Sequence, residues 1–134
     1  MTGSEFHKAP EICNRLYPYS GEKADMFSLG VVLFAMNMRT FPFERVKDVI
    51  YSRKYKHFLE GNLEKFWPTE PSTSPEFKEL VMKMLVKDPN QRISLDDVIA
   101  DKWTIIDEFP SKDEMDSEIT RCSRIVQGQV LAWA

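Results

Sequence analysis

Apolar residues occupy nearly every face of the segment from Lys23 to Arg39, KADMFSLGVVLFAMNMR. A helix that is apolar all round is buried inside a larger body, and the length of this run excludes a strand. Gly30 lies near the middle of the segment, where glycine costs about 1 kcal/mol relative to alanine. The pattern therefore predicts a buried central helix with a neighbour packed closely against its backbone at Gly30.

Further helical patterns lie on both sides of this segment. The N-terminal stretch is rich in Gly, Pro, Ser and Tyr, which predicts a loop with one helical turn around residues 10–14. A second helix is expected over residues 46–60, a third begins where Ser74 caps a run opened by Pro75, and a fourth begins at Ser94. Because no segment alternates with the period of a strand, the fold class is predicted to be all-α.

The C-terminal part differs in charge and pattern. Residues 107–118 are acidic, and apolar residues then recur every three or four positions at Met115, Ile119, Cys122 and Val126. This spacing predicts an amphipathic helix over residues 112–127, which would lie on the core or on a protein partner. We therefore expect one domain over residues 1–106 and an acidic tail over residues 107–134.

The composition excludes some classes of binding partner. The 134-residue chain has 18 basic and 21 acidic residues, a net charge of −3, which gives no field to attract nucleic acid or a membrane surface. The longest apolar run falls short of the ~20 residues that a membrane helix needs. Cys13 and Cys122 lie far apart without metal-ligand spacing, which predicts no metal site and a reducing, intracellular and cytoplasmic location.

Four short motifs occur in a defined order along the chain. They are Ala-Pro-Glu at residues 9–11, Asp-x-Phe-Ser-Leu-Gly at 25–30, Pro-Phe at 42–43 and Asp-Pro-x-x-Arg at 88–92. In this order and spacing, over residues 3–103, they resemble the C-terminal lobe of eukaryotic protein kinases, whose signature set includes Ala-Pro-Glu. The resemblance implies a partial protein-kinase-like fold, a helical C-lobe fragment without the N-lobe and the catalytic loop.

The resemblance also assigns roles to three residues. Glu11 would form a buried ion pair with Arg92, which ties the end of the activation segment to a distant helix pair. Asp25 would accept backbone N–H groups of the catalytic loop and so anchor it. From the residues alone, Glu11 and Arg92 could equally be unrelated surface charges, and an acid near the start of a helix is also favoured by the helix dipole.

Substrate binding would fall on Gly3, Ser4, Glu5 and Phe6, which resemble the loop that receives the substrate residue after the phosphoacceptor. A hydroxyl residue at the position of Ser4 is the pattern of kinases that act on serine and threonine. The basic cluster around Lys56 leaves open a preference for acidic or phosphorylated substrates. The sequence departs from the family at Phe27, Arg39 and Asp101, where tryptophan, glycine and histidine are usual, and at His7 and Lys8, which border the substrate loop.

The residues that perform phosphoryl transfer are missing from the sequence. It contains no Gly-x-Gly-x-x-Gly, Val-Ala-Ile-Lys, His-Arg-Asp or Asp-Phe-Gly. We therefore expect no catalytic residue and no ATP or magnesium site in this chain, although the family implies both cofactors for an intact enzyme.

Three hypotheses remain. The first is a Ser/Thr kinase fragment that supplies the substrate side, with an exposed apolar surface where the rest of the lobe would pack. The second is a truncated kinase-like module that sequesters substrates or a kinase partner, and the third is an unrelated helical adaptor. In-frame His-Arg-Asp and Asp-Phe-Gly codons upstream of Met1 would favour the first hypothesis, and a stop codon there the second.

Overall fold

The computed structural model describes residues 7–13, 18–44, 49–105 and 110–133, with side chains as far as residue 124. Every regular element in these ranges is helical, which confirms the all-α prediction. In chain order they are α1 (Pro10–Cys13), α2 (Gly21–Met38), the 3₁₀ helix η1 (Val49–Tyr51), α3 (Arg53–Leu59), α4 (Leu63–Phe66), α5 (Pro75–Met84), α6 (Leu95–Ile99) and α7 (Lys112–Trp133).

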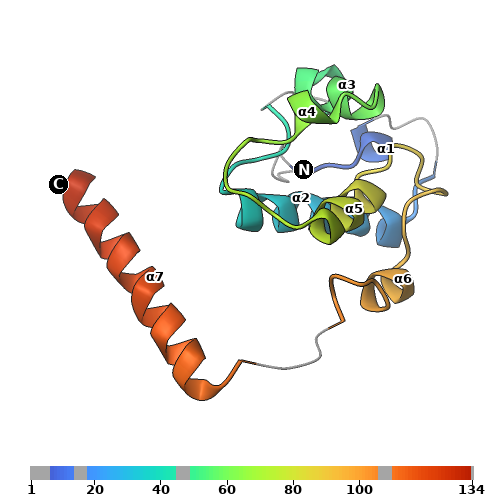
Figure 1. The fold of residues 1–134 in the computed structure, drawn as a ribbon. Coiled ribbons are helices and arrows are strands. Elements are labelled where there is room, and N and C mark those ends of the chain that lie inside the picture. The colour runs from blue at the N-terminus through green and yellow to red at the C-terminus, as the bar shows by residue number, and fades with distance from the viewer. Residues whose placement is uncertain (1–6, 14–17, 45–48, 106–109, 134) are drawn as a thin grey trace.

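The long helix α2 is the element around which the others are placed (Figure 1). It begins two residues before the predicted start because Ser20 caps it, accepting the N–H of Lys23 at 3.4 Å. One side of α2 is buried, including Phe27, Val31 and Phe34. The opposite side of α2 exposes apolar residues, which agrees with the apolar surface expected where the rest of the lobe would pack.

Helix α5 crosses α2 on its buried side. Ser74 caps α5 as predicted, accepting the N–H of Phe77 at 3.2 Å. A β-carbon placed on Gly30 would lie 2.8 Å from Cβ of Met84 and 3.2 Å from Cδ2 of Leu85. The predicted close approach at Gly30 is therefore confirmed, and its neighbour is the C-terminal end of α5.

An aromatic cluster fills the space between α2 and the helices α3 and α4. Phe43 stacks on Phe27 with ring centroids 5.9 Å apart, and Trp67 stacks on Phe34 at 5.0 Å. Tyr55 is fully buried and donates its hydroxyl to the carbonyl of Leu85 at 3.2 Å. Trp67 and Phe43 therefore belong to the same buried core.

The helix expected over residues 46–60 is divided in the structure. Ser52 has extended backbone angles (φ −68°, ψ 130°) and caps α3, accepting the N–H of Tyr55. Its hydroxyl also donates to the carboxylate of Glu44. This double role separates η1 from α3, and residues 46–48 lie outside the described ranges. The segment between α3 and α5 contains the short helix α4.

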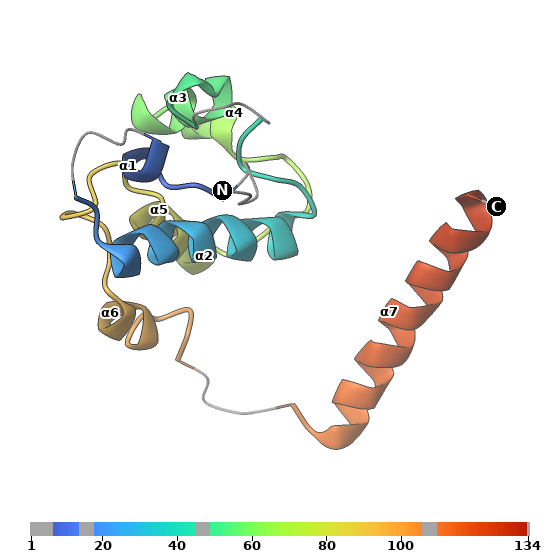
Figure 2. The same cartoon turned by 180° about the vertical axis from the view of Figure 1, so that it is seen from behind.

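Helix α7 stands apart from the other helices in both views (Figures 1 and 2). It runs to Trp133, six residues beyond the predicted end at residue 127. Ser111 and Glu114 cap its start reciprocally, because the Ser111 N–H donates to Glu114 at 2.8 Å and the Glu114 N–H donates to the Ser111 hydroxyl at 3.3 Å. Every described side chain from Lys112 to Arg124 is exposed.

We expect Arg39→Gly to raise the free energy of unfolding by about 0.5–1 kcal/mol. Arg39 ends α2 in the left-handed conformation (φ 56°, ψ 21°), where a β-carbon is strained and glycine is not. The gain is smaller than the full strain because glycine also loses more backbone entropy on folding. Urea titration measures the change, and Arg39→Ala, which keeps the β-carbon, should give no gain.

Candidate functional site

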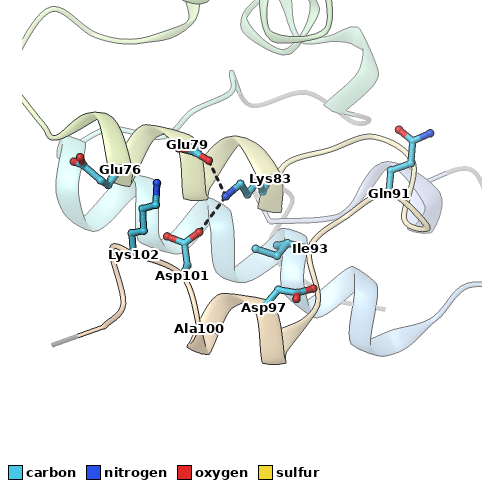
Figure 3. Close-up of a pocket in the computed structure, with 9 residues that line it drawn as sticks. All are labelled: Glu76, Glu79, Lys83, Gln91, Ile93, Asp97, Ala100, Asp101 and Lys102. Atoms are coloured by element: carbon cyan, nitrogen blue, oxygen red, sulfur yellow. Dashed lines mark hydrogen bonds and ion pairs between the residues drawn. The ribbon is translucent and has the colours of Figure 1, made fainter.

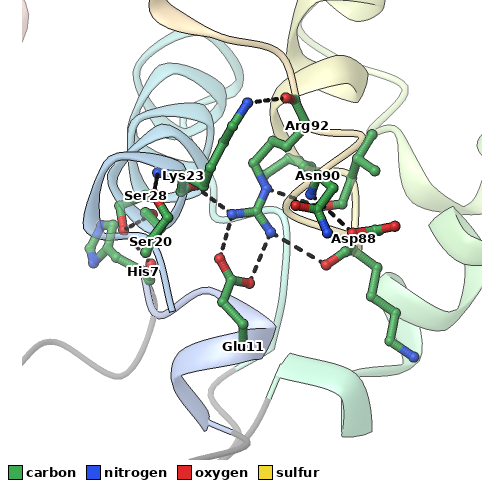
Figure 4. Close-up of polar contacts among 12 residues, drawn as sticks. His7, Glu11, Ser20, Lys23, Ser28, Asp88, Asn90 and Arg92 are labelled. Carbon is green, nitrogen blue, oxygen red and sulfur yellow. Dashed lines mark hydrogen bonds and ion pairs between the residues drawn. The ribbon is translucent and has the colours of Figure 1, made fainter. Parts of the chain in front are cut away.

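The predicted ion pair is formed by two side chains that are 81 residues apart. Arg92 follows the Asp88 turn, and its guanidinium is fully buried, with 0% of the side chain exposed, against 14% for Glu11 on α1. The pairing is bidentate, at 2.6 Å from Nη1 to Oε1 and 2.9 Å from Nη2 to Oε2 (Figure 4). Two parallel hydrogen bonds of this kind fix the relative orientation of the two side chains as well as the distance between them.

The rest of the guanidinium binds backbone carbonyls. Arg92 donates through Nε to Val86 at 3.0 Å, through Nη1 to Lys23 and through Nη2 to Lys87 at 3.4 Å. Its planar face lies over Phe27, 5.1 Å from the ring centroid. Three parts of the chain therefore meet at one side chain: α1, the first turn of α2 and the segment after α5.

Two polar contacts near the ion pair were not predicted. Lys23 donates through Nζ to the carbonyl of Arg92 at 2.8 Å. Because the carbonyl of Lys23 accepts from the guanidinium of Arg92, the two residues are joined by two hydrogen bonds. Ser28, in the middle of α2, donates to the carbonyl of His7 at 2.7 Å (Figure 4). A hydroxyl inside a run of apolar residues was the only sequence signal for the second contact.

These contacts hold the chain immediately after the predicted substrate loop. Gly3, Ser4, Glu5 and Phe6 lie outside the described residues, so their arrangement remains a prediction. The described chain resumes at His7, bonded to Ser28, and passes to Ala9, which is fully buried. The residue that follows the predicted loop, His7, is therefore held on α2.

Asp25 lies on the exposed side of α2. Its carboxylate has no hydrogen-bond or ion-pair partner among the residues that the structure describes. Leu29, Val32 and Met36 follow it at intervals of four, three and four residues, and they are 44%, 39% and 77% exposed. These spacings place all four residues along one side of the helix, which we call the open face of α2.

A second cluster of charged side chains occupies a hollow between α5 and α6 (Figure 3). Lys83 lies between Glu79 and Asp101, with Nζ–O distances of 2.9 and 3.1 Å. Hydrogen bonds to Glu79 and then Asp101 raise the pKa of Lys83, and the N–H of Trp103 together with Lys83 lowers the pKa of Asp101. Lys83 of α5 thus pairs with Asp101 just after α6, so Asp101, where histidine is usual in kinases, has a structural role here.

Among the described residues, no group of three or more His, Cys, Asp and Glu side chains could hold a metal ion. None of the helices in the described ranges has the length and apolar character needed to cross a bilayer.

Comparison with known proteins places the chain in a family. Residues 1–104 match the family described as protein kinase domain. Calcium-dependent protein kinase 28 of Oryza sativa subsp. japonica is 29% identical over 89% of this chain and 22% of its own length.

Two further relatives are named serine/threonine-protein kinases. SRK2D of Arabidopsis thaliana is 33% identical over 75% of the chain and 27% of its own length. ATG1 of Saccharomyces cerevisiae (strain ATCC 204508 / S288c) is 33% identical over 89% of the chain and 12% of its own length. The chain thus spans between about a tenth and a quarter of these relatives' length. Because the match extends over residues 1–104 and includes the motifs that meet at Arg92, the chain belongs to the protein kinase domain family.

Proposed function

We propose that this chain is the substrate-side platform of a Ser/Thr protein kinase and is not catalytically competent alone. In the intact enzyme, ATP-dependent phosphorylation of protein Ser and Thr would require the ATP-binding loop, the catalytic Asp and the magnesium ligands, none of which this sequence contains. The residues present do not fit ATP or magnesium, so we assign the chain no step of the transfer. A kinase role favours an intracellular, cytoplasmic setting.

The observation that carries this proposal is the buried fork between Glu11 and Arg92. It fixes α1 against α2, and α1 lies four residues after the predicted substrate loop, Gly3 to Phe6. Phosphoryl transfer depends mainly on positioning, because the acceptor hydroxyl must lie in line with the phosphoryl group. The described chain that follows the predicted loop is held on α2, which supports a positioning role for the loop.

The open face of α2 supports the other half of the proposal. Asp25 has no partner among the described residues, so its carboxylate is available to accept backbone N–H groups of a catalytic loop. Hydrogen bonds to a charged acceptor are worth about 1.5–3 kcal/mol each. The apolar row beside Asp25 offers a surface on which the rest of a kinase domain would pack. We therefore propose Asp25 as the anchor of the catalytic loop.

Reconstitution tests this function. The chain would be co-expressed with a polypeptide that carries the ATP-binding lobe, His-Arg-Asp and Asp-Phe-Gly of a related Ser/Thr kinase. We expect phosphate transfer from Mg-ATP to a Ser/Thr peptide mixture only when both polypeptides are present. Asp25→Asn should lower the transfer rate at least tenfold, a loss of about 1.4 kcal/mol, since the amide lacks the charge.

Glu22→Gln is the matched control, because Glu22 is also an exposed acid in α2 but lies one turn from the predicted anchor. It should leave the transfer rate unchanged. Equal losses in both variants would contradict the assignment of Asp25, and a co-purifying complex without transfer would contradict the platform function itself.

A second function is favoured by the same open face, which can hold a kinase partner without completing an active site. In that case the chain would sequester substrates or a kinase. It would then lower the rate of an intact related kinase in proportion to its concentration, and it would show no transfer in the reconstituted mixture.

A further inference from the structure

Two exposed apolar rows in this chain have the same spacing in opposite directions. On α2 the row is Leu29, Val32 and Met36, with intervals of three and four residues. On α7, read from its C-terminal side, the row is Cys122, Ile119 and Met115, also with intervals of three and four. Ile119 is 57% exposed and Met115 is 47% exposed, and Cys122 is exposed as well.

We propose that α7 of this chain folds back and packs antiparallel on the open face of α2. In this register Leu29 lies opposite Cys122, Val32 opposite Ile119 and Met36 opposite Met115. Side chains three and four residues apart form one ridge on a helix, so equal spacing lets the two rows meet along three successive levels. The parallel orientation reverses the order of the intervals and brings fewer pairs together.

Charge favours the same orientation. The start of α2 carries Glu22 and Asp25, and its C-terminal end carries Arg39. The first turn of α7 is acidic, with Asp113 and Glu114. In the proposed register Lys112 lies at the level of Arg39, and Asp113 and Glu114 follow it, so the first turn of α7 brings a net charge of −1 to Arg39. The parallel arrangement would bring that turn to Glu22 and Asp25 and cost like-charge repulsion.

The connection is long enough for this movement. Met26 of α2 belongs to the same buried cluster as Val98 of α6, so the chain leaves α6 beside the N-terminal half of α2. From Met26 to Met36 is about 15 Å along the helix, at 1.5 Å per residue. The seven steps from Ile105 to Lys112 span up to roughly 24 Å when extended.

Docking of α7 would cover the surface that the proposed function assigns to the rest of a kinase domain. The two occupants would then exclude one another, and release of α7 would become a condition for assembly. The inference itself rests on the two rows and their charges, so its failure would leave the platform function untouched.

Disulfide trapping with the native Cys122 tests the register. Cys13→Ser would remove the other cysteine, and Leu29→Cys would add a thiol at the position opposite Cys122. We expect an intramolecular disulfide, seen as a fast-migrating monomer on a non-reducing gel and assigned by mass spectrometry. Met36→Cys is the control, because it lies about 10 Å further along the helix, beyond the ~7 Å Cα–Cα limit of a disulfide.

Leu29→Cys should cross-link at least tenfold faster than Met36→Cys. Adding Ile119→Asp should slow the Leu29→Cys reaction at least tenfold, whereas Thr120→Asp, on another side of α7, should not. Faster reaction of Met36→Cys would show a different register, a disulfide-linked dimer would show a second copy as the occupant, and slow reaction of both would show that α7 does not dock. Each of these results overturns the proposal, and circular dichroism establishes that the exposed-site variants remain folded.

Discussion

Replacing Arg92 with alanine should lower the free energy of unfolding by about 3–5 kcal/mol, the loss expected when one member of a buried ion pair is removed. The substitution would strand the carboxylate of Glu11 and leave the carbonyls of Lys23 and Val86 without their donor. Domains of this size have roughly 7–20 kcal/mol of stability, so the variant would lose a large share of it. Urea titration with a constant slope gives the difference directly.

Two variants distinguish the contribution of the bidentate geometry from the contribution of the charge of Arg92. Arg92→Lys keeps a cation but cannot bind Glu11 and the carbonyls together, so its loss should be intermediate. The loss in Arg92→Ala should persist in concentrated salt, because buried pairs are weakly screened. A loss below about 1 kcal/mol, or one that disappears with added salt, is the behaviour of an exposed pair and would contradict this account.

The Glu11–Arg92 contact could be anticipated because a family motif holds each partner. The contacts of Ser28 and Lys23 could not, since each depends on where a loop passes over α2. A serine in an apolar helix can bond to its own preceding turn, and Ser28 does so with Ala24 at 3.1 Å. Its second bond, to His7, is visible only in three dimensions.

The helix boundaries also divide into those that a local sequence signal predicts and those that depend on tertiary contacts. Ser74 and Ser94 cap α5 and α6 as predicted, because a hydroxyl followed by Pro or Asp near an apolar run is a local signal. Ser52 has the same chemistry but lies inside a helical pattern, and its cap depends on Glu44 eight residues earlier. The division between η1 and α3 is therefore a tertiary effect.

The two sides of α2 illustrate a further limit. Composition predicts burial all round, yet Leu29, Val32 and Met36 are exposed while Phe27 and Phe34 are not. A periodic pattern identifies which residues require burial, but it does not say whether the residues that would bury them belong to the described part of this chain. An exposed apolar surface was expected for a kinase fragment, and the structure shows that Leu29, Val32 and Met36 form it.

Gly30→Ala should lower the free energy of unfolding by about 1–3 kcal/mol, the usual cost of overpacking, although alanine is the better helix former by about 1 kcal/mol. The added methyl group would lie 2.8 Å from Cβ of Met84, well inside the ~3.5–4.0 Å separation of carbon atoms in contact. Leu85 could turn its Cδ2 away, but Cβ of Met84 is fixed to the backbone of α5. The two helices must therefore move apart, which loosens Phe77, Leu80 and Val81 as well.

Gly21→Ala provides the comparison, because Gly21 begins the same helix and a β-carbon there would meet nothing within 4 Å. It should leave stability within about 0.5 kcal/mol of the native value, as is usual for exposed substitutions. The opposite signs of propensity and packing make the experiment decisive: if Gly30→Ala is as stable as Gly21→Ala, then α5 does not approach α2 at Gly30. The packing of Met84 and Leu85 on α2 would then have to be revised. The segment that leads from this core to Arg92 would also have to be placed again.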